Sequence, residues 1–250
     1  MQFKTLLLKI EELAETNDLS TPYIVGGVPR NIVLKKSIEF NDFDITTGDS
    51  TIHKLGELFA QHYKVEPKKM KDGHLQVIVD GIKFDFSSNF KYKHIDQILK
   101  ESDVTEIDDL VRESYSRDFT INTFLMSMDL SQIIDITDRA FNDIHHKILS
   151  SPLNSTISFQ HSPNRILRAF YYKARYGFNF SGELDQAIEE NKDLLSKIHP
   201  RYAGEILNSI LQADKNMIHE LIERGILHKL PLTKYVVKIL LENKRILEVI

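Results

Sequence analysis

Asp42 and Asp44, two positions apart, are the residues of this 250-residue sequence that point most directly to chemistry. They stand in the run NDFDITT, whose alternation of acidic and apolar residues predicts a strand. Residues two apart on a strand share a side, so the two carboxylates are neighbours while Phe43 and Ile45 face the core. Adjacent carboxylates repel unless a cation lies between them, and Mg²⁺ beside phosphates is the usual partner. Asp85, in the similar run KFDFSS, would add a third carboxylate if its strand neighbours the first.

A glycine pair precedes these acids in the run YIVGGVPRN. Gly26 and Gly27 follow a predicted strand and precede a predicted helix, where backbone N–H groups can bind phosphate. Arg30, one turn into that helix, can meet the same anion. Each feature alone is weak, since Asp-x-Asp on a solvent face and Gly-Gly in a turn are both common without function. Together they predict a triphosphate site beside two metal-binding carboxylates, which is what nucleotidyl transfer requires.

The elements that must position these residues form an α+β unit over about residues 23–135. Alternating strand and helix patterns predict a mixed β-sheet flanked by helices. Asp80-Gly81 is expected to form the tight turn of a hairpin, and Ser50 to cap a helix. The predicted strands are 23–27, 43–46, 74–80 and 82–88, and the predicted helices are 29–36 and 50–60.

From about Thr137 the strand signal fades and apolar residues recur at three- and four-residue intervals. The pattern predicts a head domain at residues 1–136 followed by an all-α neck and body segment at 137–250. The helices expected in that segment are 165–178, 182–198, 200–212 and 234–250.

The composition is that of an ordinary globular protein, with 42% hydrophobic and 27% charged residues. No apolar run approaches the roughly 18 residues that span a bilayer, and residues 1–15 read as an amphipathic helix rather than a signal peptide. The absence of cysteine excludes disulfides and thiolate metal sites and favours a cytoplasmic location. A net charge of −4 is a poor whole-molecule match to a nucleic-acid binder.

Four motifs in order, GGVPRN, NDFDITT, SRDFTINTF and PNRILRAFYYKARYGF, resemble the class II tRNA nucleotidyltransferase (CCA-adding enzyme) and bacterial poly(A) polymerase family. The resemblance runs from about Tyr23 through HPRYAGEILNSIL, which covers most of the chain. It implies a nucleotidyltransferase head, a helical segment that binds RNA and nucleotide, Mg²⁺ as cofactor, and ATP or CTP as substrates. The implied acceptor is an RNA 3′ end, with tRNA first among the candidates.

The resemblance also implies roles for individual positions. Asp42 and Asp44 match the family's metal-binding catalytic pair, and Asp85 lies near the place of a third acid. The residues at nucleotide-binding positions are Gly26, Gly27 and Arg30 for the triphosphate, Arg117, Asp118 and Asn122 for the ribose and bound nucleotide, and Ser162, Arg165 and Arg168 for the base.

The sequence departs from the family mainly on the base-reading side. His161-Ser162 stands where the family has Glu-Asp, Tyr171 replaces an arginine, and Asn31 replaces an aspartate after Arg30. The matched metal pair with an altered base-reading helix predicts an active enzyme with relaxed base preference. In an alternative interpretation His161 or Asn164 reads the base and Ser162 only caps the helix.

Three functions remain open from the sequence. The first is a Mg²⁺-dependent, template-independent RNA nucleotidyltransferase that adds AMP or CMP to RNA 3′ ends. The second is the same chemistry on a protein or small-molecule acceptor, favoured by the acidic net charge and by a C-terminal part shorter than the family's. The third is a non-catalytic nucleotide- or RNA-binding module. The sequence does not identify the acceptor, the number of additions or the oligomeric state.

Overall fold

The computed structural model describes residues 2–70, 73–88 and 94–231. The chain divides into two compact units, Met1–Ile144 and His145–Ile250. This boundary falls inside helix α6 (Ala140–His146), later than the position after residue 136 that the sequence predicted. The reason lies in a buried contact: Asp143 of α6 accepts a 2.6 Å hydrogen bond from the Thr120 hydroxyl, which fastens this helix to the first unit.

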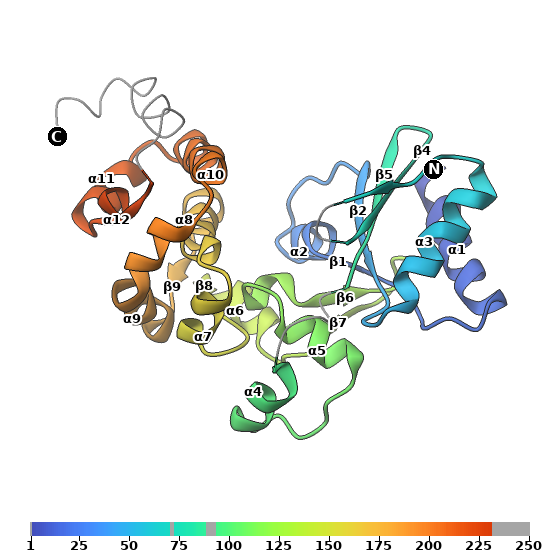
Figure 1. Cartoon of the computed structure of the whole chain (residues 1–250), viewed down its shortest axis with the longest axis horizontal. Helices are drawn as coiled ribbons and strands as arrows, with labels where there is room; N and C mark the ends of the chain where they lie inside the picture. Colours follow the sequence, from blue (N-terminus) through green and yellow to red (C-terminus); the bar gives the residue numbers. More distant parts are fainter. Residues whose placement is uncertain (1, 71–72, 89–93, 232–250) are drawn as a thin grey trace. The chain divides into compact units, whose positions relative to one another are not determined.

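Within the described residues of the first unit, seven strands form one mixed sheet in the order β3-β4-β5-β2-β1-β6-β7 (Figure 1). The strands are β1 (Tyr23–Val25), β2 (Asp42–Thr46), β3 (Lys68–Lys69), β4 (Leu75–Val79), β5 (Ile82–Phe86), β6 (Phe124–Met126) and β7 (Ile133–Asp135). β2 and β5 are parallel neighbours, and the other neighbouring pairs are antiparallel. The predicted fold class, an α+β head with a mixed sheet flanked by helices, is confirmed.

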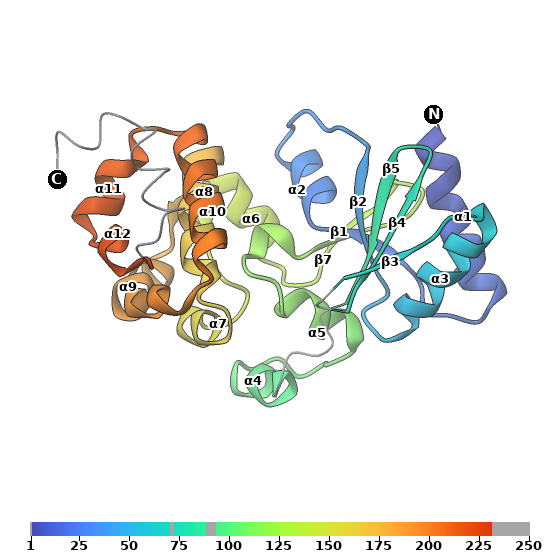
Figure 2. The ribbon, with the colours of Figure 1, turned by 45° about the horizontal axis from the view of Figure 1, so that its top comes forward.

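An aromatic core fixes which face of β2 and β5 is buried. Helices α1 (Gln2–Thr16) and α3 (Thr51–Tyr63) lie side by side, and α3 packs on the sheet (Figures 1 and 2). Phe43 of β2 stacks on Phe84 of β5 with ring centroids 5.5 Å apart, and Phe59 of α3 meets Phe84 edge-on at 5.2 Å. The remaining helical elements of this unit are α2 (Gly27–Val33), α4 (Ile95–Glu101), α5 (Asp109–Tyr115) and the 3-10 helix η1 (Thr120–Asn122).

Two local predictions have different outcomes. The hairpin is confirmed: β4 and β5 pair with Val79 opposite Ile82, and the linking Asp80 and Gly81 have φ of 51° and 79°. Positive φ at both residues is typical of the type I′ turn. Ser50 is the N-cap residue of α3 as predicted, but its side chain makes no capping hydrogen bond. The backbone N of Thr51 instead donates to the carboxylate of Asp49 at 3.0 Å. Asp49 lies one position before Ser50, and its longer side chain reaches this N–H group.

The second unit is helical, with one strand pair that the sequence did not predict. Its helices are α7 (Ser155–His161), α8 (Asn164–Tyr176), α9 (Gly182–Asn191), η2 (Lys192–Lys197), α10 (Pro200–Ala213), α11 (Met217–Glu223) and α12 (Ile226–Lys229). Two-residue strands β8 (Ile148–Leu149) and β9 (Asn179–Phe180) pair in parallel, and both contact α8. The helix predicted at 234–250 lies outside the described residues.

Arg224 joins the helices of the second unit. Its Nη1 donates to Asp185 of α9 at 2.7 Å, and its Nε lies 3.1 Å from Glu220 of α11. The guanidinium also lies over the Phe180 ring, 5.6 Å from the centroid. Because Lys173 of α8 pairs with the same Glu220 at 2.7 Å, one arginine and one lysine connect three helices.

The contact between α3 and the sheet leads to a prediction about Gly56. A Cβ at this position would lie 2.8 Å from Leu75 Cδ2 and 3.0 Å from Phe86 Cγ. Overpacking a core costs about 1–3 kcal/mol, whereas Gly→Ala in a helix gains about 1 kcal/mol. Phe86 is fully buried and cannot move away, so we expect Gly56→Ala to lower the free energy of unfolding by roughly 1 kcal/mol.

The matched control is Gly182→Ala at the start of α9, where an added Cβ meets no atom within 4 Å. Urea denaturation of both variants measures the effect. Gly182→Ala should leave stability unchanged or slightly raised. A Gly56→Ala protein as stable as the wild type would show that α3 can shift away from the sheet.

Candidate active site

The acidic pair lies on β2 as the alternation predicted. Phe43 and Ile45 are fully buried, while the side chain of Asp42 is 54% exposed and Asp44 is half-buried. The parallel pairing of β2 with β5 sets Asp44 directly opposite Asp85. The condition for a third carboxylate, that the strand of Asp85 neighbours the strand of Asp44, is therefore met, and three carboxylates lie at one place on the sheet.

Lys83 of β5 lies among these carboxylates, although no sequence pattern singled it out. Its Nζ is 2.7 Å from Asp42 Oδ2 and 3.2 Å from Asp85 Oδ2. Burial lowers the pKa of Lys83, but the hydrogen bonds to Asp42 and Asp85 outweigh it and raise that pKa above its usual value. Asp85 also accepts from Gln76 Nε2 at 2.9 Å, so strands β4 and β5 both hold it.

Gly26 makes the close approach that its type suggested. Its φ and ψ of 72° and −121° are a backbone conformation that other L-residues rarely adopt. A Cβ on Gly26 would lie 2.5 Å from Asp44 Oδ2. The glycine turn therefore leads into α2 while leaving space for a carboxylate of the neighbouring strand.

A chain of hydrogen bonds connects Arg30 to the RDFTIN motif. Arg30 Nη1 donates to Asn122 Oδ1 at 2.8 Å, and Asn122 Nδ2 donates to Asp118 Oδ1 at 2.7 Å. Asn31, which replaces the family's aspartate, accepts from Arg30 Nε at 3.2 Å. Asp118 and Asn122 are both buried, so Arg30 is held by groups that cannot easily move.

Arg117 brings a further charge to the acid pair. It donates to the carboxylate of Glu113, one turn earlier on α5, and this carboxylate is fully buried. Burial raises the pKa of Asp44, and the charges of Asp42 and Asp85 add to that effect, whereas the positive charge of Arg117 opposes it. Sequence reasoning missed Glu113; the signal that could have revealed it is the i,i+4 spacing of Glu113 and Arg117 on a helix.

The candidate base-reading residues lie in the second unit around the α7–α8 junction. Arg165 Nη1 donates to the hydroxyl of buried Ser158 at 2.7 Å, a partner that the sequence did not suggest. Arg168 Nη2 donates to the Tyr172 hydroxyl at 3.1 Å. Ser162 is half-buried and ends α7, and the N-cap position of α8 is Pro163, so the alternative that Ser162 caps α8 is not supported.

The carboxylates suit a hard divalent cation. Across residues 2–70, 73–88 and 94–231 no group of three or more His, Cys, Asp or Glu side chains is arranged to hold a metal ion. Mg²⁺ usually takes only one or two protein carboxylates and completes its shell with water and substrate phosphates. Asp42 and Asp44 offer those two carboxylates, and the ammonium of Lys83 shows that a cation is electrostatically accommodated beside Asp42. The residues present therefore fit the ion that the resemblance implies.

This mixed sheet, with an acid pair on an inner strand next to a glycine turn, is a nucleotidyltransferase head. The sequence profile of the "Poly A polymerase head domain" matches residues 22–150, slightly more than half of the chain. The chain belongs to this family.

Relatives and solved structures agree with that assignment. A CCA-adding enzyme of Bacillus pumilus is 29% identical over 177 residues, covering 70% of this chain and 42% of the relative. A CCA-adding enzyme of Bacillus subtilis is 26% identical over 211 residues, covering 84% and 51%. The Thermotoga maritima CCA-adding enzyme complexed with tRNA has a TM-score of 0.73 at 18% identity, covering 90% of this chain and 51% of that one.

A Bacillus stearothermophilus CCA-adding enzyme in complex with CTP gives a TM-score of 0.71 at 22% identity, covering 94% and 56%. At these identities the structural likeness shows the fold. The chain spans about half, or less, of the length of the curated relatives named above. In the part of the chain that the structure describes, no helix has both the length and the apolarity to cross a membrane.

The geometry at Gly26 predicts a large difference between two adjacent glycines. In Gly26→Ala the new Cβ meets Asp44 Oδ2 and the backbone is strained, so we expect a loss of about 1–3 kcal/mol in the free energy of unfolding. In Gly27→Ala the nearest atom is Arg30 Nη2 at 3.6 Å, an ordinary contact, so the loss should stay within about 0.5 kcal/mol. Urea denaturation of the two variants checks this; equal losses would contradict the assigned close approach.

Proposed function

We propose that this chain carries the head and following helical segment of a Mg²⁺-dependent, template-independent RNA nucleotidyltransferase. It adds nucleotides, AMP or CMP, to RNA 3′ ends, with tRNA as the favoured acceptor. The observation that carries the proposal is the meeting of Asp42, Asp44 and Asp85 beside Gly26 within one unit. The names of the relatives, CCA-adding enzymes, support the acceptor and the added bases. A cytoplasmic location, expected from the cysteine-free sequence, belongs to the same proposal.

In the head domain, different residues would bind the metal ion and the triphosphate. Asp42 and Asp44 would hold Mg²⁺, which when bound lowers the pKa of the attacking 3′-hydroxyl and neutralises charge on the departing pyrophosphate. The backbone at Gly26 and Gly27 would approach the triphosphate closely, since no side chain intervenes. Arg30 would bind the outer phosphates, with its orientation fixed through Asn122.

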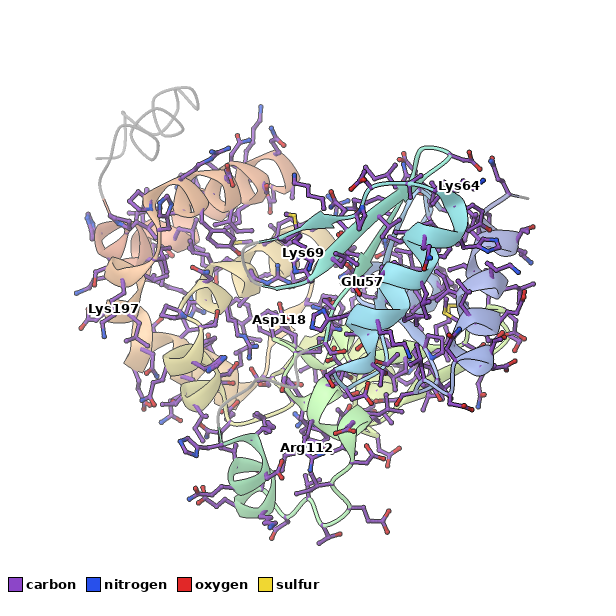
Figure 3. All side chains as sticks on the ribbon, turned by 45° about the vertical axis from the view of Figure 1, so that its right-hand side comes forward. Glu57, Lys64, Lys69, Arg112, Asp118 and Lys197 are labelled. Atoms are coloured by element: carbon purple, nitrogen blue, oxygen red, sulfur yellow. The ribbon has the colours of Figure 1, made fainter. Side chains whose placement is uncertain are left out.

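Arg117, Asp118 and Asn122 would then line the nucleotide from the RDFTIN motif. Asp118 accepts from both Asn122 Nδ2 and the backbone N of Phe119, at 2.7 and 2.9 Å. Because this carboxylate is buried and doubly hydrogen-bonded, its role in the proposal is to keep Asn122 and Arg30 in place (Figure 3 labels Asp118). Asp85 would be the third acid of the site, and it is held by a hydrogen bond from Gln76 and an ion pair with Lys83.

The second unit would supply base selection through Ser162, Arg165 and Arg168. Arg165 donates to the Ser158 hydroxyl, and a guanidinium is a donor that suits a ring nitrogen or carbonyl of a base. Partial burial and the Arg165 charge both lower the pKa of His161, and a histidine cannot supply the negative charge of the family's acidic pair. The proposed consequence is weak discrimination between amino-bearing and carbonyl-bearing bases.

Transfer assays with each of the four labelled nucleoside triphosphates test the function. The full chain is incubated with Mg²⁺ and, separately, tRNA lacking its 3′ end, other RNA, or a protein fraction. Label in tRNA from ATP or CTP is the expected result. Label only in protein would support the same chemistry on another acceptor, and no label with measurable nucleotide binding would support a non-catalytic module.

The metal assignment gives a sharp prediction for the acid pair. Asp42→Ala and Asp44→Ala should each lower transfer at least a hundredfold, because each removes a ligand of the cation. Asp44→Ala should leave the fold intact, since burial already disfavours its charged form. Transfer rates and thermal unfolding are measured together. Activity within tenfold of the wild type in either folded variant would exclude the two-carboxylate metal site.

Ser162→Asp tests base selection. A carboxylate accepts from the amino group of adenine or cytosine and repels a carbonyl oxygen, and such a mismatch costs about 1–3 kcal/mol. We expect the preference for ATP and CTP over GTP and UTP to increase about tenfold or more. Ser162→Ala is the matched control, because it removes the hydroxyl without adding charge. Transfer ratios that stay the same in Ser162→Asp would remove Ser162 from the base site.

A further inference from the structure

Helix α8 carries a row of basic and aromatic side chains, of which the proposed base selection uses only the beginning. The helix contains Arg165, Arg168, Lys173 and Arg175 but no Asp or Glu, although the whole chain has a net charge of −4. It packs against α10 within the second unit (Figure 1). No acid of the same helix can pair with these cations, so the charge of α8 suits an anionic partner.

Arg175, near the end of α8, lies over two tyrosine rings. Its guanidinium carbon is 5.8 Å from the ring centroid of Tyr171 and 5.7 Å from that of Tyr176. Arg175 is exposed, and both tyrosines are half-buried. A guanidinium within about 6 Å of an aromatic centroid is attracted by the ring, which favours one arrangement of the two groups. These three side chains, the Arg175 group, therefore form one arranged cluster at the surface.

The Arg175 group continues the row that begins at Arg168. Arg168 Nη2 donates to the Tyr172 hydroxyl at 3.1 Å, and the Tyr172 ring stacks on Tyr176 with centroids 6.0 Å apart. Tyr172 is buried, so it supports its neighbours rather than meeting a ligand. Residues seven apart share one face of a helix. Arg168 and Arg175 are thus separated by about 10 Å along that face, the length of roughly three stacked nucleotides.

A role in stability alone does not explain this arrangement. Two other cations of the same unit pair with carboxylates, Arg224 with Asp185 at 2.7 Å and Lys229 with Asp193 at 2.5 Å. A cation that only stabilised the fold could be paired in the same way. Arg175 lies instead against aromatic rings and keeps its charge at the surface.

Aromatic rings beside a cation offer a face for a base and a charge for a phosphate. Proteins that bind single-stranded nucleic acid combine these two contacts, and such binding tolerates any base because every base has a π-face. Duplex RNA is recognised mainly through its shape, its 2′-hydroxyls and its phosphates, whereas unpaired bases can stack on aromatic side chains. The chemistry of the Arg175 group therefore favours an unpaired strand.

We propose that Tyr171, Arg175 and Tyr176 bind the unpaired nucleotides at the 3′ end of the RNA acceptor, with the rings stacking on bases and the guanidinium contacting phosphate. This inference deepens the proposed function and rests on it, because it takes the acceptor to be RNA. The Arg175 group holds the acceptor strand and does not select the incoming nucleotide.

Tyr171→Ala should weaken the binding of unpaired RNA at least about fivefold, because it removes one stacking ring. Tyr171→Phe keeps the ring and should bind within about twofold of the wild type. Binding of duplex RNA should be the same in all three proteins. The full chain is titrated, without nucleoside triphosphate, into a fluorescein-labelled unpaired RNA of about ten nucleotides and a blunt duplex of the same length, and fluorescence anisotropy is recorded.

Arg175→Gln tests the phosphate contact through its salt dependence. Loss of one phosphate contact to a single strand should make the slope of log affinity against log salt concentration shallower by about 0.7. The matched control is Lys229→Gln, which removes another cation of the same unit whose side chain is 42% exposed. It should leave the slope unchanged. Thermal unfolding of every variant is recorded, and if Tyr171→Ala fails to fold, the slope of Arg175→Gln decides the question.

Three results would overturn the inference alone: equal affinity for unpaired RNA in the wild type and Tyr171→Ala, an equal loss in Tyr171→Phe and Tyr171→Ala, or an unchanged slope in Arg175→Gln. Displacement of the labelled RNA by poly-glutamate as readily as by unlabelled RNA would also overturn it, since the surface would then suit an acidic protein. Transfer to tRNA by the wild type would leave the proposed function standing in each case. A wild type that binds neither RNA would overturn the RNA acceptor of the proposed function and the inference with it.

Discussion

The parallel pairing of β2 with β5 is the constraint on which the rest of the first unit depends. Because side chains alternate along a strand, the register that stacks Phe43 on Phe84 in the core also sets Asp44 opposite Asp85 on the other face. A slip of one residue would bury the carboxylates and expose the aromatic rings. Packing of the aromatic core therefore also holds the carboxylates of Asp44 and Asp85 close together, although their like charges repel each other.

Holding acids together requires positive charge nearby, and the structure supplies it from two sides. Lys83, on β5 itself, pairs with Asp42 and Asp85, while the positive charge of Arg117, which follows α5, lowers the pKa of Asp44. The two cations differ in how firmly they are held. The Lys83 side chain is 34% exposed, whereas Arg117 is tied to fully buried Glu113.

The sequence predicted what local patterns determine. Alternation placed β2 and the Asp-Gly turn placed the hairpin, whereas the convergence of Asp85 with Asp44 stayed conditional until the structure paired β2 with β5. The sequence could not predict contacts between segments that are distant along the chain. Lys83 read as an ordinary strand residue until the pairing set it beside Asp42, and Glu113 drew no prediction from the sequence until its burial singled it out. The strand pair β8–β9 was missed because two-residue strands carry no periodic signal.

The two groups of candidate residues depend on different kinds of packing, and this difference affects how each can change. The acid pair is set by backbone pairing in the sheet, which tolerates many substitutions as long as the alternation persists. The candidate base-reading residues belong to a separate compact unit and make side-chain contacts there, such as Arg165 to Ser158. Replacing one residue there alters hydrogen bonding without disturbing β2 or β5. A chain can therefore keep the acid pair of its family while carrying His161-Ser162 in place of Glu-Asp, and the constraints on base selection are the weaker of the two.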